Sequence, residues 1–145
     1  MKDIHSDLKA VVAIEAATLS ADPTPPAIDL QGYDAAELVI AVGVGGISFS
    51  GTNKNEFKLT HSDDNSSYSA VEQKDVLGVT VASGGIIKAL TAAHAAAAVY
   101  RAGYKGGKRY LKLLPDFSGT HGTGTPIAAV ALLGHGFNKP EADQA

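Results

Sequence analysis

The residues of this sequence that could do chemistry most directly stand together at His61, Ser62, Asp63 and Asp64. An imidazole beside a hydroxyl and two carboxylates could activate a nucleophile, and the carboxylates could bind a hard metal ion such as Ca²⁺. Adjacent residues of a strand point to opposite faces, however, so a triad cannot be built from these neighbours. Asp and Ser also close hairpins by bonding to their own backbone. The segment is interpreted as a turn, with no catalytic or metal-binding residues.

The remaining candidates for cofactor chemistry are no stronger. The five histidines, which are His5, His61, His94, His121 and His135, form neither HxxxH nor HExxH. The absence of cysteine removes thiolate nucleophiles, disulfides and the commonest structural zinc sites. The glycine-rich stretches 103–107 and 119–124 lack the helix start that a phosphate loop needs. The sequence therefore predicts no enzymatic activity and no cofactor.

The most polarised stretch runs from residue 101 to 112 and contains basic and aromatic side chains but no acidic one. A hairpin of this kind could bind single-stranded nucleic acid through charge and stacking. The whole chain has a net charge of −3, which favours an ionic contact with an acidic protein partner over nucleic acid. The candidate contact residues are Arg101, Lys105, Lys108, Arg109 and Lys112, together with Pro23, Pro25 and Pro26 of an N-terminal arm.

The composition is that of one globular domain. A chain of 145 residues with 45% hydrophobic and 19% charged residues can bury a core and does not suggest disorder. No apolar run is long enough to span a bilayer, and residues 1–7 lack the pattern of an export signal. We expect a single domain over residues 1–145 that binds neither membranes nor nucleic acid.

The elements that must position these residues are short strands separated by turn residues. This pattern is typical of an all-β sandwich or barrel, here with about six to eight antiparallel strands. Strands are expected near 9–16, 28–30, 36–44, 56–60, 68–72, 76–82, 86–90, 99–104, 109–114 and 126–133. The 56–72 and 76–90 segments are expected to form hairpins, and the ends of the chain, 1–7 and 138–145, to be flexible polar tails.

Two segments interrupt the strand pattern. Prolines 23, 25 and 26 forbid regular ladder pairing, so residues 18–27 are expected to form a loop. Residues 89–98 read ALTAAHAAAA, and alanine is the best helix former, so one or two helical turns are expected there. Small residues also suit a tightly packed strand or an extended connection, and the choice is left open.

The sequence resembles small structural proteins encoded in the head modules of tailed bacteriophages and prophages. The resemblance covers most of the chain. It depends on residues 103–114 (GYKGGKRYLKLL) and 124–135 (GTPIAAVALLGH), and on Phe57, Leu59, His61, Ser62, Asp63, Asp64, Tyr68 and Val71.

The resemblance implies a non-enzymatic virion protein that decorates or cements the phage head. Its partners would be the major capsid protein and further copies of itself, as a homo-oligomer and specifically a trimer. Such a protein would be made in the host cytoplasm and located in the virion. It needs an apolar self-associating face, which the small-residue strands of this chain could supply.

Two other readings remain open. The chain could be a host-adhesion or carbohydrate-binding module, because β-sandwiches often carry such sites on their loops. Sugar rings usually stack on exposed aromatic side chains, however, and this sequence has no Trp and only five Tyr residues. A head spike base or a head–tail connector component is the other alternative.

Overall fold

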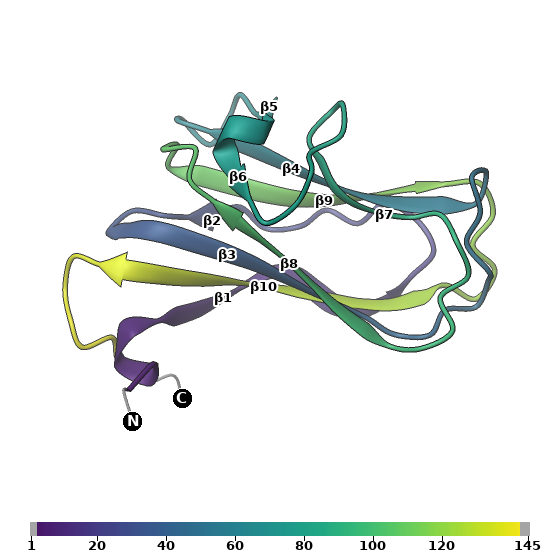
Figure 1. Ribbon diagram of the computed structural model, residues 1–145, viewed down its shortest axis with the longest axis horizontal. Coiled ribbons are helices and arrows are strands. Elements are labelled where there is room, and N and C mark those ends of the chain that lie inside the picture. The colour runs from purple at the N-terminus through teal and green to yellow at the C-terminus, as the bar shows by residue number, and fades with distance from the viewer. Residues whose placement is uncertain (1–2, 143–145) are drawn as a thin grey trace.

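Two antiparallel β-sheets pack face to face in the computed structural model, which describes residues 3–142 (Figure 1). Sheet A has the strand order β1-β10-β3-β8-β6, and these strands span Lys9–Leu19, Thr125–Gly136, Tyr33–Val42, Ala98–Tyr104 and Val76–Leu77. Sheet B has the order β2-β9-β4-β5, with β7 also paired to β4, and these strands span Ile28–Asp29, Tyr110–Ser118, Lys54–Ser62, Ser69–Ala70 and Ile86–Leu90. The expected all-β sandwich is confirmed.

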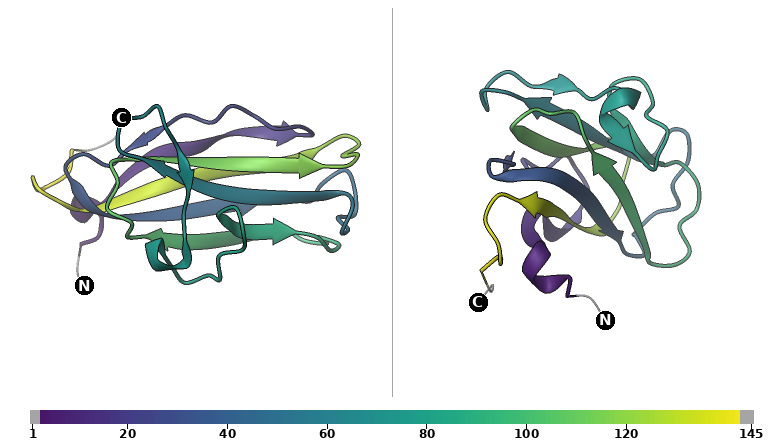
Figure 2. Two further views of the ribbon diagram at one scale, coloured as in Figure 1. Left: turned by 90° about the horizontal axis from the view of Figure 1, so that it is seen from above. Right: turned by 60° about the vertical axis from the view of Figure 1, so that its left-hand side comes forward.

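The core lies between the two sheets and follows the alternation of the sequence. On β3, Leu38, Ile40 and Val42 are each no more than 1% exposed, because every second residue of a strand points to the same face. Phe57 and Leu59 of β4 oppose them from sheet B and are fully buried. The long strands of both sheets run along the long axis of the molecule, as Figure 2 shows from above.

The structure has ten strands, and seven of them are at least five residues long. The seven agree with the expected six to eight, and β2, β5 and β6 are two-residue strands. Within residues 3–142 the helical elements are two short 3₁₀ turns, η1 (His5–Asp7) and η2 (Gln73–Asp75). No helix among these residues is long and apolar enough to cross a bilayer.

Of the two alternatives left open for residues 89–98, the structure shows the connection between strands and not the helical turns. β7 ends at Leu90, the chain then runs without regular structure, and β8 begins at Ala98. β7 belongs to sheet B and β8 to sheet A, so this segment must cross from one sheet to the other. Ten residues of favourable helix propensity are too few to form a helix by themselves in water, and the crossing decides the conformation.

Two expected hairpins take a different form. Residues 76–82 and 86–90 are joined only by the isolated bridge between Ala82 and Ile86, because β6 pairs with β8 instead. The basic stretch 101–112 is also not a hairpin, since β8 lies in sheet A and β9 in sheet B. The hairpin of β4 and β5, in contrast, forms as expected through the pairs of Thr60 with Ala70 and His61 with Ser69.

β1 is a long edge strand of sheet A with an irregular ladder. It pairs with β10 along one side, and its register shifts between Val12 and Ile14 and again between Ile14 and Ala17. The residues after it, from Ser20 to Ala27, form the expected proline-containing loop, although the strand continues to Leu19.

The described parts of the two terminal segments contact one another. The Glu141 amide donates to the Ser6 carbonyl at 3.0 Å, and Lys139 pairs with Asp7 at 2.8 Å. The Tyr33 hydroxyl donates to the Glu141 carboxylate at 2.7 Å, and burial raises the pKa of this tyrosine to about 12. Residues 1, 2 and 143–145 of the expected flexible tails lie outside the described residues.

Candidate functional site

The outer face of sheet A, which points away from the core, is apolar at nearly every central position. The inner strands of sheet A are β10, β3 and β8, and along each of them residues that point outward alternate with residues that point into the core. These outward residues are Pro126, Ala128, Val130 and Leu132 on β10, Ala35, Glu37, Val39 and Ala41 on β3, and Val99, Arg101 and Gly103 on β8. Their only charged members are Glu37 and Arg101.

Large apolar side chains on this face are open to solvent. Val99 is 67% exposed, Val12 of β1 is 50% exposed, and Leu77 of β6 is 54% exposed. Val12, Val130 and Val39 are paired in register across three adjacent strands and form one apolar row. Sheet faces in water usually show polar outward residues, so this face is a candidate for contact with another molecule.

An open groove of about 560 Å³ crosses the same face near the end of β1. Alanine lines much of it, with Ala16 from β1, Ala41 from β3 and Ala128 from β10. Val99 and Pro126 complete its apolar wall. The groove therefore extends the apolar surface instead of adding a polar binding site.

The outer face of sheet B has the opposite character. Lys58 of β4 is paired with Asp116 of β9, and Lys54 is paired with Glu56 along β4. The hydroxyl of Thr60 donates to a backbone carbonyl of β9. These charged and polar side chains satisfy one another in water, so the two outer faces of the sandwich differ sharply in what they can bind.

Three of the five basic residues expected to contact a partner already have acidic partners within the chain, and two of these three are arginines. Arg109 donates from Nε and Nη2 to the two carboxylate oxygens of Asp29, each at 2.9 Å. This two-pronged contact lowers the pKa of Asp29 and raises that of Arg109. Arg101 pairs with Glu37 at 3.2 Å on the outer face of sheet A.

The other three basic residues lie near the β4–β5 turn and the end of β8. Lys108 pairs with Asp63 at 3.4 Å, and the ammonium of Lys112 lies 4.7 Å from the ring centre of Tyr68. Lys105 is exposed and has no ion pair with any residue in 3–142. The segment 101–112 contains no acidic residue, but acidic residues from other parts of the chain pair with three of its five basic residues.

The three prolines expected to contact a partner lie in the loop after β1. Pro25 is buried, Pro23 is half-buried and Pro26 is exposed. The carboxylate of Asp22 accepts the backbone amide of Phe117 at 2.7 Å, which fixes the start of the loop against β9. Pro26 is therefore the member of this group that a partner could reach most easily.

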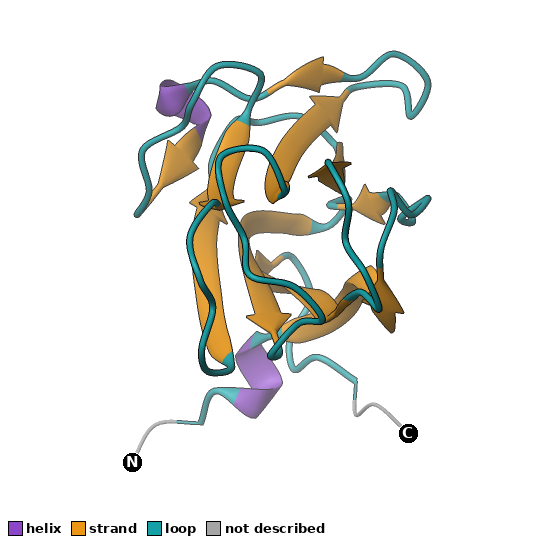
Figure 3. Cartoon of the chain, turned by 90° about the vertical axis from the view of Figure 1, so that its right-hand side faces the viewer, coloured by secondary structure: helices purple, strands orange, loops and turns teal. Residues whose placement is uncertain are grey.

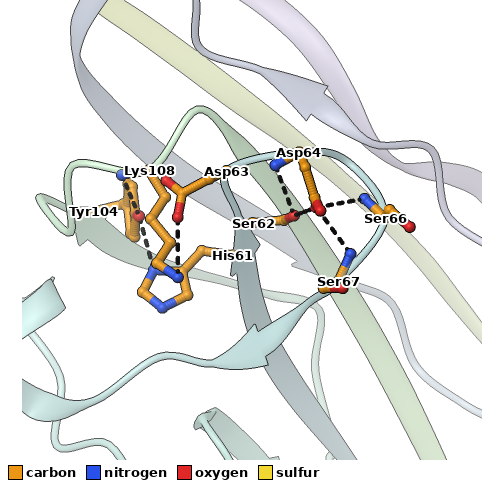
Figure 4. Close-up of polar contacts among 8 residues, drawn as sticks. All are labelled: His61, Ser62, Asp63, Asp64, Ser66, Ser67, Tyr104 and Lys108. Atoms are coloured by element: carbon orange, nitrogen blue, oxygen red, sulfur yellow. Dashed lines mark hydrogen bonds and ion pairs between the residues drawn. The ribbon is translucent and has the colours of Figure 1, made fainter.

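Of the four residues at 61–64, His61 and Ser62 end β4, and Asp63 and Asp64 begin the turn that follows it (Figure 4). The carboxylate of Asp64 accepts the amides of Ser66 and Ser67, both at 2.9 Å, and the Ser62 hydroxyl at 2.8 Å. These hydrogen bonds, led by the two amides, lower the pKa of Asp64 to about 2. All three hydrogen bonds go to one oxygen, Oδ1 of Asp64, which therefore holds the loop.

His61 points away from this loop into the sandwich. Its Nδ1 lies 2.8 Å from the hydroxyl of Tyr104, which also accepts the Lys108 amide at 3.2 Å (Figure 4). Burial lowers the pKa of His61, with Lys108 acting in the same direction and the carboxylate of Asp75 in the opposite one. His61 and Ser62 therefore have separate partners, and no nucleophile–base pair is formed.

The opposite end of the sandwich, which faces the viewer in Figure 3, is covered by long loops and contains buried polar side chains. His121 is 3% exposed, its Nε2 lies 2.7 Å from the Ser118 carbonyl, and its ring contacts Phe117 at 4.8 Å. Asn55 and Thr125 are fully buried. Within the described chain, the Asn55 amide and the Thr125 hydroxyl have no hydrogen-bond partner.

These polar groups do not assemble into a reactive centre. Among residues 3–142, no three His, Asp or Glu side chains are placed to hold a metal ion together. The buried groups without a hydrogen-bond partner among these residues are the Asn55 amide, the Thr125 hydroxyl and the Nδ1 atoms of His94 and His121. The surface that best fits a function is the outer face of sheet A.

That face was missed by the sequence reasoning, although two signals for it were present. Residues 36–44 alternate, but their second face contains Val39 and Ala41 as well as Glu37. Residues 126–133, PIAAVALL, are apolar at both alternating sets of positions. Strands that are apolar on both faces are usually packed on both faces, so residues 126–133 could have pointed to an apolar outer face.

Comparison with known proteins gives little further information. No family model matches the sequence, and no curated protein matches it. One solved structure that resembles the chain is that of the SPBc2 prophage-derived protein YomS, with 12% sequence identity and a TM-score of 0.48. The similarity covers 88% of this chain and 92% of that one.

Proposed function

We propose that this chain is a non-enzymatic structural protein of a tailed-phage particle, and that it stabilises the head as a capsid decoration protein. The observation that carries the structural part is the apolar outer face of sheet A, which a protein working alone in water would not expose. The placement in a virion depends on the sequence resemblance described above. The partners are the major capsid protein and further copies of the chain.

A decoration protein of this kind would act through the large number of its copies on one capsid. Many copies on a symmetric shell stabilise it even when each contact is weak, because binding to the assembled state shifts the equilibrium away from disassembly. One surface must then hold copies or neighbours together, and another must contact the shell. Lys105 and Pro26, which are exposed, are the proposed shell contacts among the candidate residues.

Co-sedimentation with capsids assembled from the major capsid protein of the same phage tests this function. We expect the purified chain to pellet with the capsids and to appear in electron micrographs as regular decoration. The variant Lys105→Glu should reduce the bound fraction at physiological salt. Lys9→Glu, which changes an exposed lysine on β1, is the matched control and should bind like the natural chain.

The result that overturns the decoration role is the absence of the chain from the capsid pellet at every salt concentration. Retention on host cells or on a glycan array would then favour the adhesion module. No observation in the structure favours that alternative, because none of the five tyrosines is exposed: four are half-buried and Tyr104 is buried.

A further inference from the structure

The exposed apolar face of sheet A must be covered by a surface of matching size. Strands lie about 4.8 Å apart and rise about 3.3 Å per residue, so four strands over eight residues form a face of roughly 20 by 25 Å. With side-chain relief, such a face offers accessible area of the order of the 800 Å² that each partner buries in a stable interface. The face is therefore large enough for a specific protein contact.

The charges on the face identify the kind of surface that covers it. Glu37 of β3 and Arg101 of β8 are its central charged residues, one of each sign, and their side chains lie 3.2 Å apart. Arg101 is paired in register with Val39, and Glu37 with Gly103, so the two charges sit diagonally across the β3–β8 ladder. A partner surface that is complementary to this face must place a basic residue near Glu37 and an acidic residue near Arg101.

We infer that a second copy of this chain covers the face, in a two-fold symmetric dimer of sandwiches. In an isologous contact the same patch meets itself, so a patch with one charge of each sign is complementary to its own rotated image. A two-fold axis that lies in the interface between β3 and β8 places β3 of one copy over β8 of the other. Because Glu37 is paired in register with Gly103, Glu37 of each copy then lies over Gly103 of its partner, two residues along β8 from Arg101.

The apolar residues fit the same arrangement. β3 and β8 are the third and fourth strands of the five-stranded sheet, so an axis between them passes close to the middle of the face. The rotation brings β10 of one copy opposite β6 of the other. Val130 and the exposed Leu77 would then lie on facing strands, and both would leave solvent.

This inference rests on the proposed function only in that both require self-association, and it changes the expected symmetry. A two-fold contact through one sheet face builds a dimer, whereas the sequence resemblance implied a trimer. Of the capsid contacts proposed above, Pro26 lies outside the face, in the loop after β1, whereas Lys105 lines a groove at the edge of the face with Glu37, Leu77 and Arg101. Dimer formation is measured on the free chain and capsid binding by co-sedimentation, so the two are separate measurements.

The first test is the oligomeric state of the full chain by sedimentation velocity over a wide concentration range. We expect a dimer for the natural chain. Val130→Glu should raise the dissociation constant at least about tenfold, because a charge would be buried in an apolar contact. Ser69→Glu, on the exposed strand β5 of sheet B, is the matched control and should remain dimeric.

The second test exchanges charges and does not depend on the stability of any one variant. Glu37→Arg alone and Arg101→Glu alone each place like charges in contact across the interface and should be monomeric. An equimolar mixture of these two variants should form a heterodimer, since the acids of one chain then meet the bases of the other. Circular dichroism of each variant confirms that it is folded.

The outcomes separate this inference from the proposed function. A monomeric natural chain, a trimer insensitive to Val130→Glu, or folded charge variants that do not associate on mixing would overturn the dimer. If the natural chain is monomeric and still decorates capsids, the function stands and the inference fails. If it dimerises as described and binds no capsid, the inference stands and the decoration role fails.

Discussion

The imidazole of His61, on sheet B, lies 2.8 Å from the phenol of Tyr104, on sheet A, so one buried hydrogen bond joins the two layers of the sandwich. The Tyr104 oxygen accepts the Lys108 amide, and its own proton can be donated to Nδ1 when that nitrogen carries none. Burial also lowers the pKa of His61. The neutral form of His61 is therefore the one that the fold stabilises.

The first prediction concerns acid sensitivity. Burial lowers the pKa of His61 below its ordinary value of 6.5, so the unfolded chain binds this proton more readily than the folded chain. The stabilising contribution is complete above pH 6.5 and is lost as the pH falls through the folded pKa. We expect the urea midpoint to decrease as the pH falls below 6.5, and His61→Gln should remove that part of the decrease.

An NMR titration of the His61 imidazole is the control for this experiment, and it should give a pKa below 6.5. A His61→Gln variant that loses stability with acid as steeply as the natural chain would assign the effect to other groups.

A second prediction concerns the turn at Asp64. Its carboxylate accepts two backbone amides and one hydroxyl, and an NMR titration should give a pKa of about 2. The stabilisation of the loop is present above the ordinary value of 3.8 and disappears as the pH falls through about 2. In Ser62→Ala the pKa should rise only part of the way towards 3.8, since the amides remain. An ordinary pKa in the natural chain would show that these hydrogen bonds do not persist in solution.

A third prediction uses two asparagines with opposite environments. Asn55 is fully buried with an unpartnered amide, whereas the Asn53 carbonyl oxygen accepts the Thr120 amide at 2.9 Å. Replacing a buried unpaired polar group by an apolar one of similar shape removes a desolvation cost of about 1–3 kcal/mol. Asn55→Leu should therefore raise the free energy of unfolding in urea, and Asn53→Leu should lower it. Equal losses for both variants would contradict this interpretation.

A fourth prediction separates backbone strain from steric clash at two neighbouring glycines. Gly84 and Gly85 both have positive φ, at 87° and 79°. A Cβ at Gly84 would meet no atom within 4 Å, whereas one at Gly85 would lie 2.6 Å from the Leu59 carbonyl oxygen. Gly84→Ala should cost about 1 kcal/mol of stability from the left-handed conformation alone. Gly85→Ala should cost clearly more, and thermal unfolding measures both.

The strands could be predicted from the sequence where apolar residues alternate over a long segment. Which strands pair with one another could not be predicted. Residues 36–44 predicted β3 because every second residue is a large apolar one. The same alternation cannot tell which sheet a strand joins, so the crossing from β8 to β9 was taken for a hairpin. Pairing in a sandwich depends on contacts between residues far apart in sequence, such as Val76 with Tyr104.

The candidate contacts were predictable only as residue types. The basic residues at 101–112 stand without acids in the sequence, and the fold then brings Glu37, Asp29 and Asp63 to them from other strands and loops. Charge neutralisation of this kind is decided by strand register, which the local sequence does not contain. The apolar outer face, in contrast, was already visible as a second apolar set in residues 126–133.

The two register shifts in β1 have a consequence for a protein held at high density. A straight edge strand of eleven residues would offer a continuous row of amides and carbonyls to the edge of any neighbouring sheet. Here that row is broken at Val12–Ile14 and at Ile14–Ala17, so an approaching strand loses alignment after a few residues. Neighbouring molecules can thus contact one another through their sheet faces, while pairing between their edge strands, which would build fibres, is disfavoured.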